Sequence, residues 1–498
     1  MKQPSILFIT TDEQHVDTAY RADMPFRLDG LRALMSRSDV YTRAYSASPV
    51  CLPARCAWMS GRLPHRSGCV SNHYGASLPL RQPNLFTCLK QRGYTTSMHG
   101  KCHFVPCPYG VVRRGLTLEY GHVKHYYKSL GMDHLDVQDD KYGSIWFYDD
   151  YATEMEQRGL LAAYRDRFFN ANAKPEELPE YPHAKETHPD SWVGQKALDY
   201  LDRCSPDQPH FLWASFSAPH YPMDAPSDYF HRVDMNRDIP RRFRQGEWDD
   251  PSKHGRHGWF GTGVSTEGSA NARDNAQKNF SEDYWRAWRL RYYANIVQAD
   301  DHIAAIIAKA RAIWGDNLCV VFTSDHGDMM GNHGLWGKNT ALYDDVLRVP
   351  LVVHHPGQTA RRDVPQTVSS VDVFPTLLAM AGCEPPANID GKPLPEIAAL
   401  GGRDTIISSC EGRVAVIKGN MKLCVNSTGF EYTPDSVIHR ELYDLQNDPH
   451  EFVNLYNDPA HQRAREELEA LLRGEPNLLR TIFFQRNETP YWFKPGYA

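Results

Sequence analysis

A cysteine and an arginine lie four positions apart in the stretch "CLPAR", Cys51 to Arg55, at the expected start of a helix. Pro53 suits a first helical turn, where its missing N–H is not needed, and Gly61 suits a helix end. Free N–H groups and the helix dipole favour negative charge near Cys51, and Arg55, about one turn later, can lean back toward it. The spacing therefore favours an anionic group at position 51 beside a cation.

Metal-type donors follow two apolar runs that are distant in the sequence. Asp12 follows the run Ser5–Thr11, and Asp325 and His326 follow the run Leu318–Thr323. Carboxylates are the ligands that Ca²⁺ and Mg²⁺ prefer, whereas an imidazole shifts the preference toward Mn²⁺ or another transition metal. If the two runs are neighbouring strands, these three side chains form a metal site.

The elements that would position these groups are buried parallel strands. Both runs are continuously apolar, which is typical of strands covered on both faces, and Phe211–Phe216 is a third such run, followed by a loop with His220. The helical pattern Glu282–Trp314, closed by Gly315, leads into the second run and predicts a crossover unit. Ligands bind at the carboxyl ends of such strands, so we expect an α/β fold with one polar rim.

Composition excludes several classes of function. The chain has 498 residues, of which 41% are hydrophobic, and a net charge of -6. Acids and bases are interspersed, so neither nucleic acid nor a membrane is an expected partner. The first residues read as a core strand and not as a signal peptide, and no apolar segment has the length of a membrane span. The eleven cysteines are scattered and odd in number, which favours a reducing cytoplasm over a disulfide framework.

The chain divides into three expected parts. Residues 1–400 form the catalytic domain, 401–475 a smaller C-terminal α+β subdomain, and 476–498 an aromatic tail that makes a dimer or tetramer a fair expectation. Short strands are expected over Thr405–Leu455 and a charged helix over Ala460–Leu472. The stretches Val105–His188 and Pro222–Asn279 are less regular, and either binding elements or surface elaboration accounts for them.

Six stretches, in this order along the chain, resemble a known family. The first, Cys-x-Pro-x-Arg, looks like the signature of the type I sulfatases of the alkaline phosphatase superfamily, whose cysteine is oxidised to the aldehyde formylglycine. The other five resemble later segments of that family: "GYTTSMHGKCHF", "SFSAPHYP", "FTSDHGDMMGNHGLWGK", "VSSVDVFPTLLAMAG" and "ELYDLQNDPHEFVNL". Within the family, "GKCHF" is similar to the branch of cytosolic bacterial arylsulfatases and choline sulfatases.

The resemblance implies a fold, a cofactor and partners. The fold is alkaline-phosphatase-like: a mixed, largely parallel sheet sandwiched by helices, with a smaller C-terminal α+β subdomain. The cofactors are formylglycine made from Cys51 and one divalent metal ion, Ca²⁺ in preference to Mn²⁺ or Mg²⁺. The partners are a small-molecule sulfate ester and, during maturation, the formylglycine-generating enzyme.

It also implies a role for each site residue. One hydroxyl of the hydrated aldehyde at Cys51 attacks sulfur, and loss of a proton from the other re-forms the aldehyde and expels sulfate. Lys101 and Lys338 bind the sulfate oxygens, and Arg55 holds the nucleophile. His220 is the general acid for the leaving alcohol, and His103 deprotonates the second hydroxyl. The metal ligands are the position-51 side chain together with Asp12, Asp325, His326 and Glu13, which stands where many members have a second aspartate.

Two other functions compete with hydrolysis of a sulfate monoester. A phosphonate monoester or phosphodiester hydrolase of the same superfamily also uses formylglycine, but such enzymes have Tyr and Thr where this chain has Lys101 and His103. A non-catalytic metal-binding protein would keep Cys51 as a thiol. The sequence does not select between aryl, alkyl and sugar sulfates.

Overall fold

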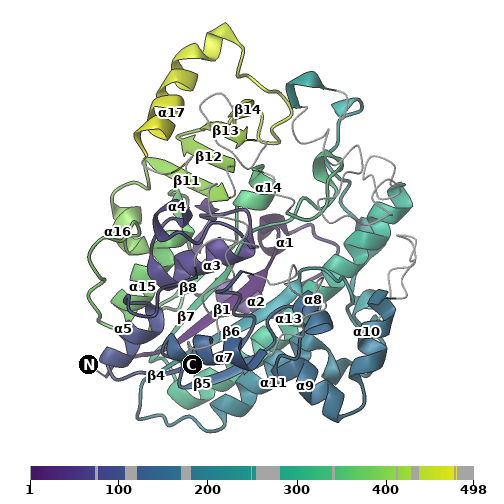
Figure 1. Ribbon diagram of the computed structural model, residues 1–498, viewed down its shortest axis with the longest axis vertical. Coiled ribbons are helices and arrows are strands. Elements are labelled where there is room, and N and C mark those ends of the chain that lie inside the picture. The colour runs from purple at the N-terminus through teal and green to yellow at the C-terminus, as the bar shows by residue number, and fades with distance from the viewer. Residues whose placement is uncertain are drawn as a thin grey trace.

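A central eight-stranded sheet organises the computed structural model, which describes residues 2–72, 77–106, 120–169, 181–247, 250–253, 281–338, 342–410, 413–427, 437–475 and 478 (Figure 1). The sheet is mixed, with mostly parallel strands, and two short strands form one of its edges. In spatial order they are β5 (His134–Val137), β4 (Thr95–Gly100), β6 (His210–Pro219), β1 (Ser5–Asp12), β7 (Leu318–Ser324), β8 (Leu351–His354), β2 (Asp39–Tyr41) and β9 (Arg362–Val364).

The five strands from β5 to β7 are parallel, and β8 is antiparallel to both of its neighbours. The predicted strands are confirmed: β1 and β7 each extend one residue beyond prediction, and β6 extends further at both ends. The predicted helix Glu282–Trp314 is present as α13, with the Ser281 side chain capping its start and Gly315 closing its end. The crossover from α13 into β7, which pairs parallel to β1, is therefore as expected.

Helices cover both faces of this sheet, because successive residues of a strand point to opposite sides. Ile6 and Phe8 of β1 belong to one core, while Leu7 and Ile9 belong to the other. The first core is covered by α3 (Cys51–Ser60), α5 (Leu85–Gln91), α7 (Tyr120–Ser129), α15 (Val373–Met380) and α16 (Leu394–Ala399). The second is covered by α1 (Val16–Tyr20), α2 (Asp29–Met35), α9 (Asp150–Gln157), α10 (Leu161–Phe169), α11 (Pro189–Leu201) and α13 (Glu282–Trp314).

Smaller elements complete the chain. A two-stranded parallel sheet joins β3 (Ala44–Tyr45) to β10 (Val368–Ser369), and the remaining short helices are α4 (Pro64–Ser67), α8 (Lys141–Trp146) and α14 (Asp344–Leu347). Short 3₁₀ turns occupy Lys185–Thr187, Ser227–Arg232, Met235–Arg237, Pro251–Lys253, Asn332–Gly334, Ser370–Asp372 and Pro459–His461. Within the described ranges, no helix is both long and apolar enough to cross a membrane.

A separate four-stranded antiparallel sheet lies toward the C-terminus, at the top of Figure 1. Its strands, in order, are β11 (Thr405–Cys410), β12 (Arg413–Lys418), β13 (Met421–Ser427) and β14 (Val437–Asp444). One face packs on α14 and neighbouring residues of the body, and the other packs on α17 (Gln462–Gly474). The expected C-terminal strands and helix are present, whereas the tail 476–498, apart from Leu478, lies outside the described residues.

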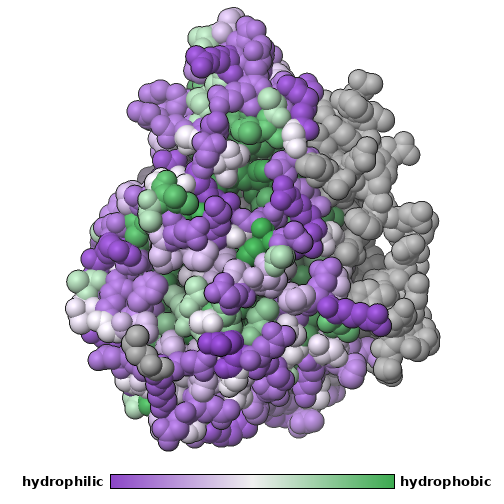
Figure 2. Space-filling view, turned by 90° about the vertical axis from the view of Figure 1, so that its left-hand side faces the viewer, coloured by the Kyte–Doolittle hydropathy of each residue, from purple (hydrophilic) through white to green (hydrophobic). Residues whose placement is uncertain are grey.

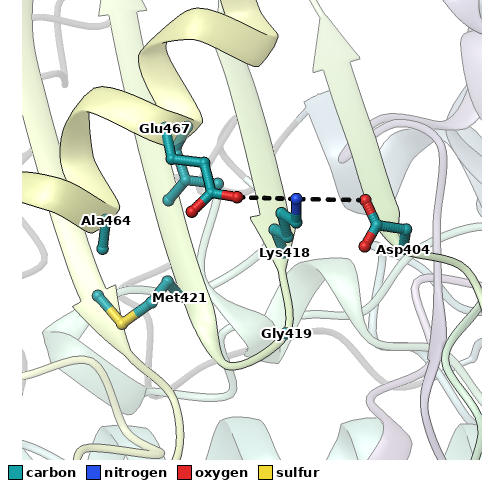
Figure 3. Close-up of a pocket in the computed structure, with 7 residues that line it drawn as sticks. Asp404, Lys418, Gly419, Met421, Ala464 and Glu467 are labelled. Atoms are coloured by element: carbon teal, nitrogen blue, oxygen red, sulfur yellow. Dashed lines mark ion pairs between the residues drawn. The ribbon is translucent and has the colours of Figure 1, made fainter.

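Few large apolar side chains are exposed among the described residues. Figure 2 shows a mostly hydrophilic face on which apolar residues appear in separate patches. A shallow pocket between β12, β13 and α17 has Lys418 at its centre, 2.8 Å from Glu467 and 3.5 Å from Asp404 (Figure 3). None of the predicted site residues lines this pocket.

The stretch Val105–His188, expected to be irregular, contains β5, α7, α8, α9 and α10 in its described part. Tyrosines fill the core positions of these helices: Tyr126, Tyr127, Tyr151 and Tyr164 are all buried. A tyrosine reads as polar in a sequence pattern, although its ring packs like a large apolar side chain, so the helical periodicity is hidden. Described parts of Pro222–Asn279 contain only 3₁₀ turns, and 248–249 and 254–280 lie outside the described residues.

Candidate active site

Four neighbouring parallel strands deliver predicted site residues to one edge of the large sheet. Asp12 is the last residue of β1. Asp325 directly follows β7, Lys101 directly follows β4, and His220 directly follows β6. The strand order places these four ends side by side, β4-β6-β1-β7. The convergence predicted from strand ends is therefore present, although these residues span most of the chain.

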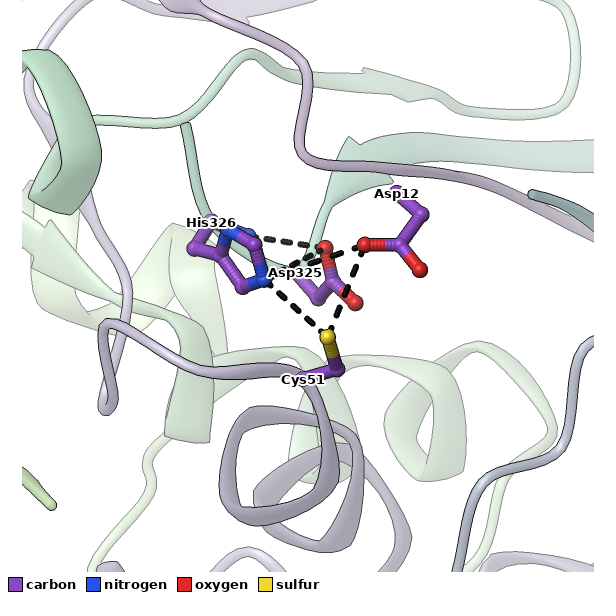
Figure 4. A group of neighbouring side chains, drawn as sticks. All are labelled: Asp12, Cys51, Asp325 and His326. Atoms are coloured by element: carbon purple, nitrogen blue, oxygen red, sulfur yellow. Dashed lines mark hydrogen bonds and ion pairs between the residues drawn. The ribbon is translucent and has the colours of Figure 1, made fainter. Parts of the chain in front are cut away.

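The edge carries a compact group of four side chains, Asp12, Cys51, Asp325 and His326 (Figure 4). One ligand-type atom from each lies within 4.8 Å of the others. The Cys51 Sγ is 3.3 Å from His326 Nε2 and 3.7 Å from Asp12 Oδ1, and the His326 Nε2 is 3.8 Å from Asp325 Oδ1. Cys51 is the first residue of α3, so the predicted helix start is confirmed to within two residues.

Hydrogen bonds aim the donors of this group inward. His326 Nδ1 lies 2.9 Å from the Gly327 carbonyl, which only accepts, so Nδ1 carries a proton and Nε2 faces the other three residues. Asp325 Oδ1 accepts the backbone N–H groups of Glu13 and His326 at 3.1 and 3.0 Å. Two carboxylates, an imidazole nitrogen and the position-51 side chain form a donor set that fits a divalent cation.

Mutual repulsion shows in the acidic members of the group. Burial, and then the facing Asp12 carboxylate, raise the pKa of Asp325. Burial and the Cys51 thiolate also oppose ionisation of Asp12, but Lys101, His220 and Lys338 outweigh them and lower its pKa. Burial lowers the pKa of His326, yet the charges of Asp325 and Cys51 prevail and raise it to about 9, so without a metal Nε2 holds a proton that a bound cation would displace. Two buried carboxylates this close favour a cation between them.

Arg55 is fully buried and locked in place. Its Nε donates to Asp325 Oδ2 at 2.8 Å, and its Nη1 donates to the Lys101 carbonyl and to Ser215 Oγ, both at 2.9 Å. The Ser215 hydroxyl in turn donates to the Lys101 carbonyl at 2.7 Å. A guanidinium held by three neighbours is a rigid positive charge beside the four-residue group.

Cys51 lies in a positive environment despite its burial. Burial raises the pKa of its thiol, but the charges of Lys101, Lys338 and His326 and a hydrogen bond from His103 bring that pKa well below its usual value. Lys338 Nζ lies 3.1 Å from the sulfur. A group in this position therefore carries negative charge easily, as the position at a helix start suggested.

Lys101 is held by acids on both sides. Its ammonium is fully buried, forms an ion pair with Asp12, and lies 2.5 Å from Asp140 Oδ2. Gly100 precedes it with φ 107°, and a Cβ there would come within 2.0 Å of the Ser215 carbonyl. Only glycine allows β4 and β6 to approach so closely, and this approach places Lys101 at the rim.

His220 and His103 border the same space. The His220 Nδ1 donates to the Tyr221 carbonyl at 2.7 Å, which leaves Nε2 toward the rim, 3.4 Å from Glu13 Oε2. Burial lowers the pKa of His220, but Asp140 and Asp12 raise it above its usual value. His103 has φ 51°, its ring nitrogens are shielded from solvent, and the ring lies close enough to the Cys51 sulfur to lower the pKa of that thiol.

Glu13 lies apart from the four-residue group that it was predicted to join. Its carboxylate is 3.3 Å from Lys338 Nζ and 3.4 Å from His220 Nε2, and it raises the pKa of the buried Asp328, for which burial is the larger cause. The structure thus brings Asp12, Cys51, Asp325 and His326 together and places Glu13 between the two groups expected to bind sulfate and to donate a proton.

Four polar side chains at the rim had no role from the sequence: Asn72, Ser215, Asp139 and Asp140. Asn72 accepts the Leu52 N–H at 2.9 Å and its amide lies 3.7 Å from the Cys51 sulfur. Asp139 and Asp140 follow β5, the strand that sequence reasoning left inside an irregular stretch. The short alternation "HLDV" before a pair of acids was the available signal.

Comparison with known proteins identifies the relatives of this chain. The family model described as "Sulfatase" matches residues 4–383. The uncharacterized sulfatase YidJ of Escherichia coli is 26% identical over 97% of this chain and 89% of its own, and an arylsulfatase of Clostridium perfringens is 24% identical over 95% and 94%. A solved phosphonate monoester hydrolase from Silicibacter pomeroyi superposes with a TM-score of 0.76 at 21% identity, covering 96% of this chain and 97% of that one.

Proposed function

This chain belongs to the sulfatase family and is a sulfuric ester hydrolase, and on that premise we propose that it hydrolyses small sulfate monoesters with a formylglycine nucleophile formed from Cys51. The observation that carries the proposal is the environment of the Cys51 sulfur. Two carboxylates and an imidazole approach it on one side, and Lys338 lies 3.1 Å away. A purely structural cysteine needs none of these neighbours, because buried thiols in apolar surroundings are inert.

The proposed reaction has two covalent steps. A hydroxyl of the hydrated aldehyde at position 51 loses its proton to solvent and then forms an O–S bond while the bond from sulfur to the ester oxygen breaks. Lys101 and Lys338 hold the sulfate oxygens, and His220 donates its Nε2 proton to the departing alcohol. His103 then removes the proton of the second hydroxyl. The C–O bond to sulfate breaks, the aldehyde re-forms and is hydrated again by water.

Arg55 and Glu13 support this sequence without reacting. Arg55 places a fixed charge below the nucleophile, because Asp325, Ser215 and the Lys101 carbonyl leave its guanidinium no freedom. Glu13 spans Lys338 and His220, the groups on either side of the ester bond that breaks. We also keep the prediction that Glu13 is a metal ligand, and in this structure its carboxylate contacts Lys338 and His220.

We propose one divalent metal held by Asp12, Asp325, His326 and the position-51 side chain, with Glu13 as the further predicted ligand. The facing carboxylates and the inward Nε2 of His326 support it. When bound, such an ion lowers the pKa of a hydroxyl and offsets developing negative charge. The carboxylates favour Ca²⁺, and His326 is the feature that favours Mn²⁺ over Mg²⁺.

The second candidate activity is hydrolysis of phosphonate monoesters or phosphodiesters. The likeness to the Silicibacter pomeroyi enzyme in fold motivates it. Lys101 and His103 at the rim favour sulfate, because Tyr and Thr are expected there in such enzymes. We therefore expect phosphorus esters to be turned over as a side activity at the same site.

We also propose the cellular compartment of the enzyme, its maturation and its assembly. Ten cysteines lie in the described part of the chain with no disulfide among them, and nine of these are buried, which supports a reducing cytoplasm. We further propose maturation by a formylglycine-generating enzyme, a catalytic domain over 1–400 with a subdomain over 401–475, and assembly into a dimer or tetramer through the tail 476–498. The substrates we expect are aryl sulfates and small alkyl or sugar sulfates.

The deciding experiment is the mass of the tryptic peptide Ala44 to Arg55, taken from protein made alongside a formylglycine-generating enzyme. We expect the aldehyde in place of the thiol, and we expect the same protein to release sulfate from 4-nitrophenyl sulfate. An intact thiol in protein that nevertheless releases sulfate would overturn the nucleophile. Turnover of phosphonate monoesters well above that of sulfate esters would make the second candidate the main activity.

A further inference from the structure

Two adjacent acids after β5, Asp139 and Asp140, contact three of the predicted catalytic residues. Asp139 Oδ1 accepts the backbone N–H groups of Cys102 and His103, at 3.0 and 2.6 Å. Its Oδ2 accepts the hydroxyls of Tyr120 and Tyr127, the latter at 2.7 Å. The Asp139 side chain therefore acts on its neighbours as a hydrogen-bond acceptor.

The contact between Asp139 and His103 fixes an unfavourable backbone. His103 has φ 51°, a region that residues other than glycine seldom occupy. The backbone hydrogen bond to Asp139 therefore helps to hold His103 in this conformation, with its ring beside the Cys51 sulfur.

Asp140 works on side chains and by charge. One of its oxygens, Oδ2, lies 2.5 Å from Lys101 Nζ, and the other, Oδ1, lies 3.5 Å from His220 Nδ1. The carboxylate is thus placed between the sulfate-binding ammonium and the proton-donating imidazole, and it attracts both. Without it, Lys101 would be drawn toward Asp12 alone, and the positive form of His220 would lose its nearest carboxylate other than Glu13.

A second set of contacts fixes the acid pair relative to His220. Lys141, the next residue, is fully buried and lies 3.3 Å from Asp224 Oδ1 and 2.9 Å from Asn295 Oδ1. Asp224 stands four residues after His220, so this ion pair ties the segment after β5 to the segment after β6. The distance between Asp140 and His220 is therefore set by a buried pair beneath them, not by the two residues alone.

We propose that Asp139 and Asp140 are the positioning residues of the leaving-group side of the site: Asp139 sets His103 through its backbone, and Asp140 sets Lys101 and His220 by its charge. This inference rests on the proposed roles of those three residues. Substitution by asparagine distinguishes the two acids. An amide can still accept the N–H hydrogen bonds that Asp139 receives, but it cannot supply the negative charge that Asp140 provides.

The test for Asp140 is the dependence of kcat/KM on the leaving group, measured on formylglycine-bearing enzyme with its metal. Asp140→Asn should reduce kcat/KM about 10-fold for 4-nitrophenyl sulfate and about 10³-fold for an alkyl sulfate, because only the poor leaving group needs a well-placed proton donor. Asp140→Glu should recover most of the loss on the alkyl ester. Asp136→Asn is the matched control: it removes the charge from a 2.7 Å contact to His99 on the same two strands, outside the rim.

The outcomes are distinct. Equal losses for both esters in Asp140→Asn, or the same pattern in Asp136→Asn, would reduce Asp140 to a structural residue and overturn the inference alone. Lack of sulfate release by the unchanged enzyme would overturn the proposed function, and this inference with it.

The test for Asp139 is the step that releases sulfate. Asp139→Ala should displace His103, so intact-protein mass after mixing with 4-nitrophenyl sulfate should show chains that carry one covalent sulfate, while kcat falls about 10²-fold and kcat/KM changes little. Asp139→Asn should show neither effect. Accumulation in both variants, or in neither, would overturn the role given to Asp139.

Discussion

Two regions of the molecule bury charged side chains, and they do so in different ways. At the rim of the large sheet, the side chains of Asp12, His326 and Lys338 all approach one atom, the Cys51 sulfur. Beneath the C-terminal sheet, the fully buried Lys422 lies 2.7 Å from Asp344 and 2.5 Å from Glu451. We call this second region the Lys422 cluster; it also contains Lys253 and Glu247.

The charges of the Lys422 cluster are satisfied by one another. The Asp344 N–H donates to Glu451 Oε2 at 2.6 Å, and Lys253 donates to Glu247 at 2.9 Å and to the Glu451 carbonyl at 2.7 Å. These contacts join β13 and the segment after β14 to α14, so they hold the C-terminal sheet against the body. Burial of charge is common to both regions; what distinguishes the rim, and supports its proposed catalytic role, is convergence on a single atom that is able to act as a nucleophile.

The largest effect is expected from removing the Cys51 sulfur, the atom that the rim side chains approach. Cys51→Ala should reduce kcat about 10⁵-fold, the scale seen when a covalent nucleophile is removed, with little change in the melting temperature. Sulfate release from 4-nitrophenyl sulfate and a thermal melt, measured on the same preparation, check it. Activity within 10-fold of the unchanged enzyme would mean that the side chains around Cys51 do not serve catalysis through this residue.

The next largest effect is expected from a metal-type donor. Asp325→Asn should reduce kcat/KM about 10³-fold and lower the metal content from one ion per chain, because the amide is a weaker ligand and also weakens the 2.8 Å contact to Arg55. Elemental analysis of dialysed protein gives the metal content. Asp136→Asn, which removes a carboxylate elsewhere on the sheet, should leave it unchanged. Equal metal content in all three proteins would contradict the proposed site.

Lys422→Met should have the opposite signature from Cys51→Ala. It removes the only cation within contact of both Asp344 and Glu451 among the described ion pairs, so we expect a loss of about 3–5 kcal/mol in unfolding free energy. Turnover per folded molecule should stay within about 2-fold, a change of under about 0.5 kcal/mol in the barrier. Denaturant unfolding and active-site titration separate the two quantities.

Lys418→Met is the matched control, because Lys418 is partly exposed on the adjacent strand and pairs with Glu467 at the surface (Figure 3). An exposed pair of this kind contributes about 1 kcal/mol or less. If both variants lost the same stability, the Lys422 cluster would be no more important than a surface pair.

The same contrast explains what the sequence reveals in advance. The buried strands β1, β6 and β7 are continuous apolar runs, so their ends, and hence Asp12, His220 and Asp325, are predictable from local pattern. Cys51 and Arg55 are predictable because proline and glycine mark the bounds of α3. Their roles, however, came from the ordered resemblance to a family and not from pattern.

The residues that were missed depend on contacts across the fold. Asp140 is recognisable only once β5 is known to lie beside β4, since its partners Lys101 and His220 belong to other strands. Lys422 and Asp344 are 78 positions apart, and no local spacing predicts their pairing. Glu13 has the right neighbours in sequence for a metal ligand, but the positive φ of 65° is part of a backbone that the sequence does not specify.

The smallest effect we predict is a pH dependence that belongs to the Lys422 cluster alone. One ammonium serves two carboxylates there; burial raises the pKa of Glu451 from 4.5 to about 7, Lys422 opposes this and Asp344 adds to it. The folded chain then holds a proton on Glu451 that the unfolded chain releases at lower pH. Stability should therefore fall as pH rises from about 5 to 7, by about 3 kcal/mol, and should change no further from this source above that range.

Glu451→Gln isolates this contribution, because the variant has nothing to ionise at that position while every histidine still titrates. The difference in unfolding free energy between Glu451→Gln and the unchanged protein should shift by about 3 kcal/mol in favour of the variant between pH 5 and pH 8. The pH profile of kcat/KM should be the same in both, since no described contact of Glu451 involves a rim residue. A constant stability difference would mean that Glu451 stays ionised throughout, and a displaced activity profile would mean that the two buried clusters are electrostatically coupled and that the comparison fails.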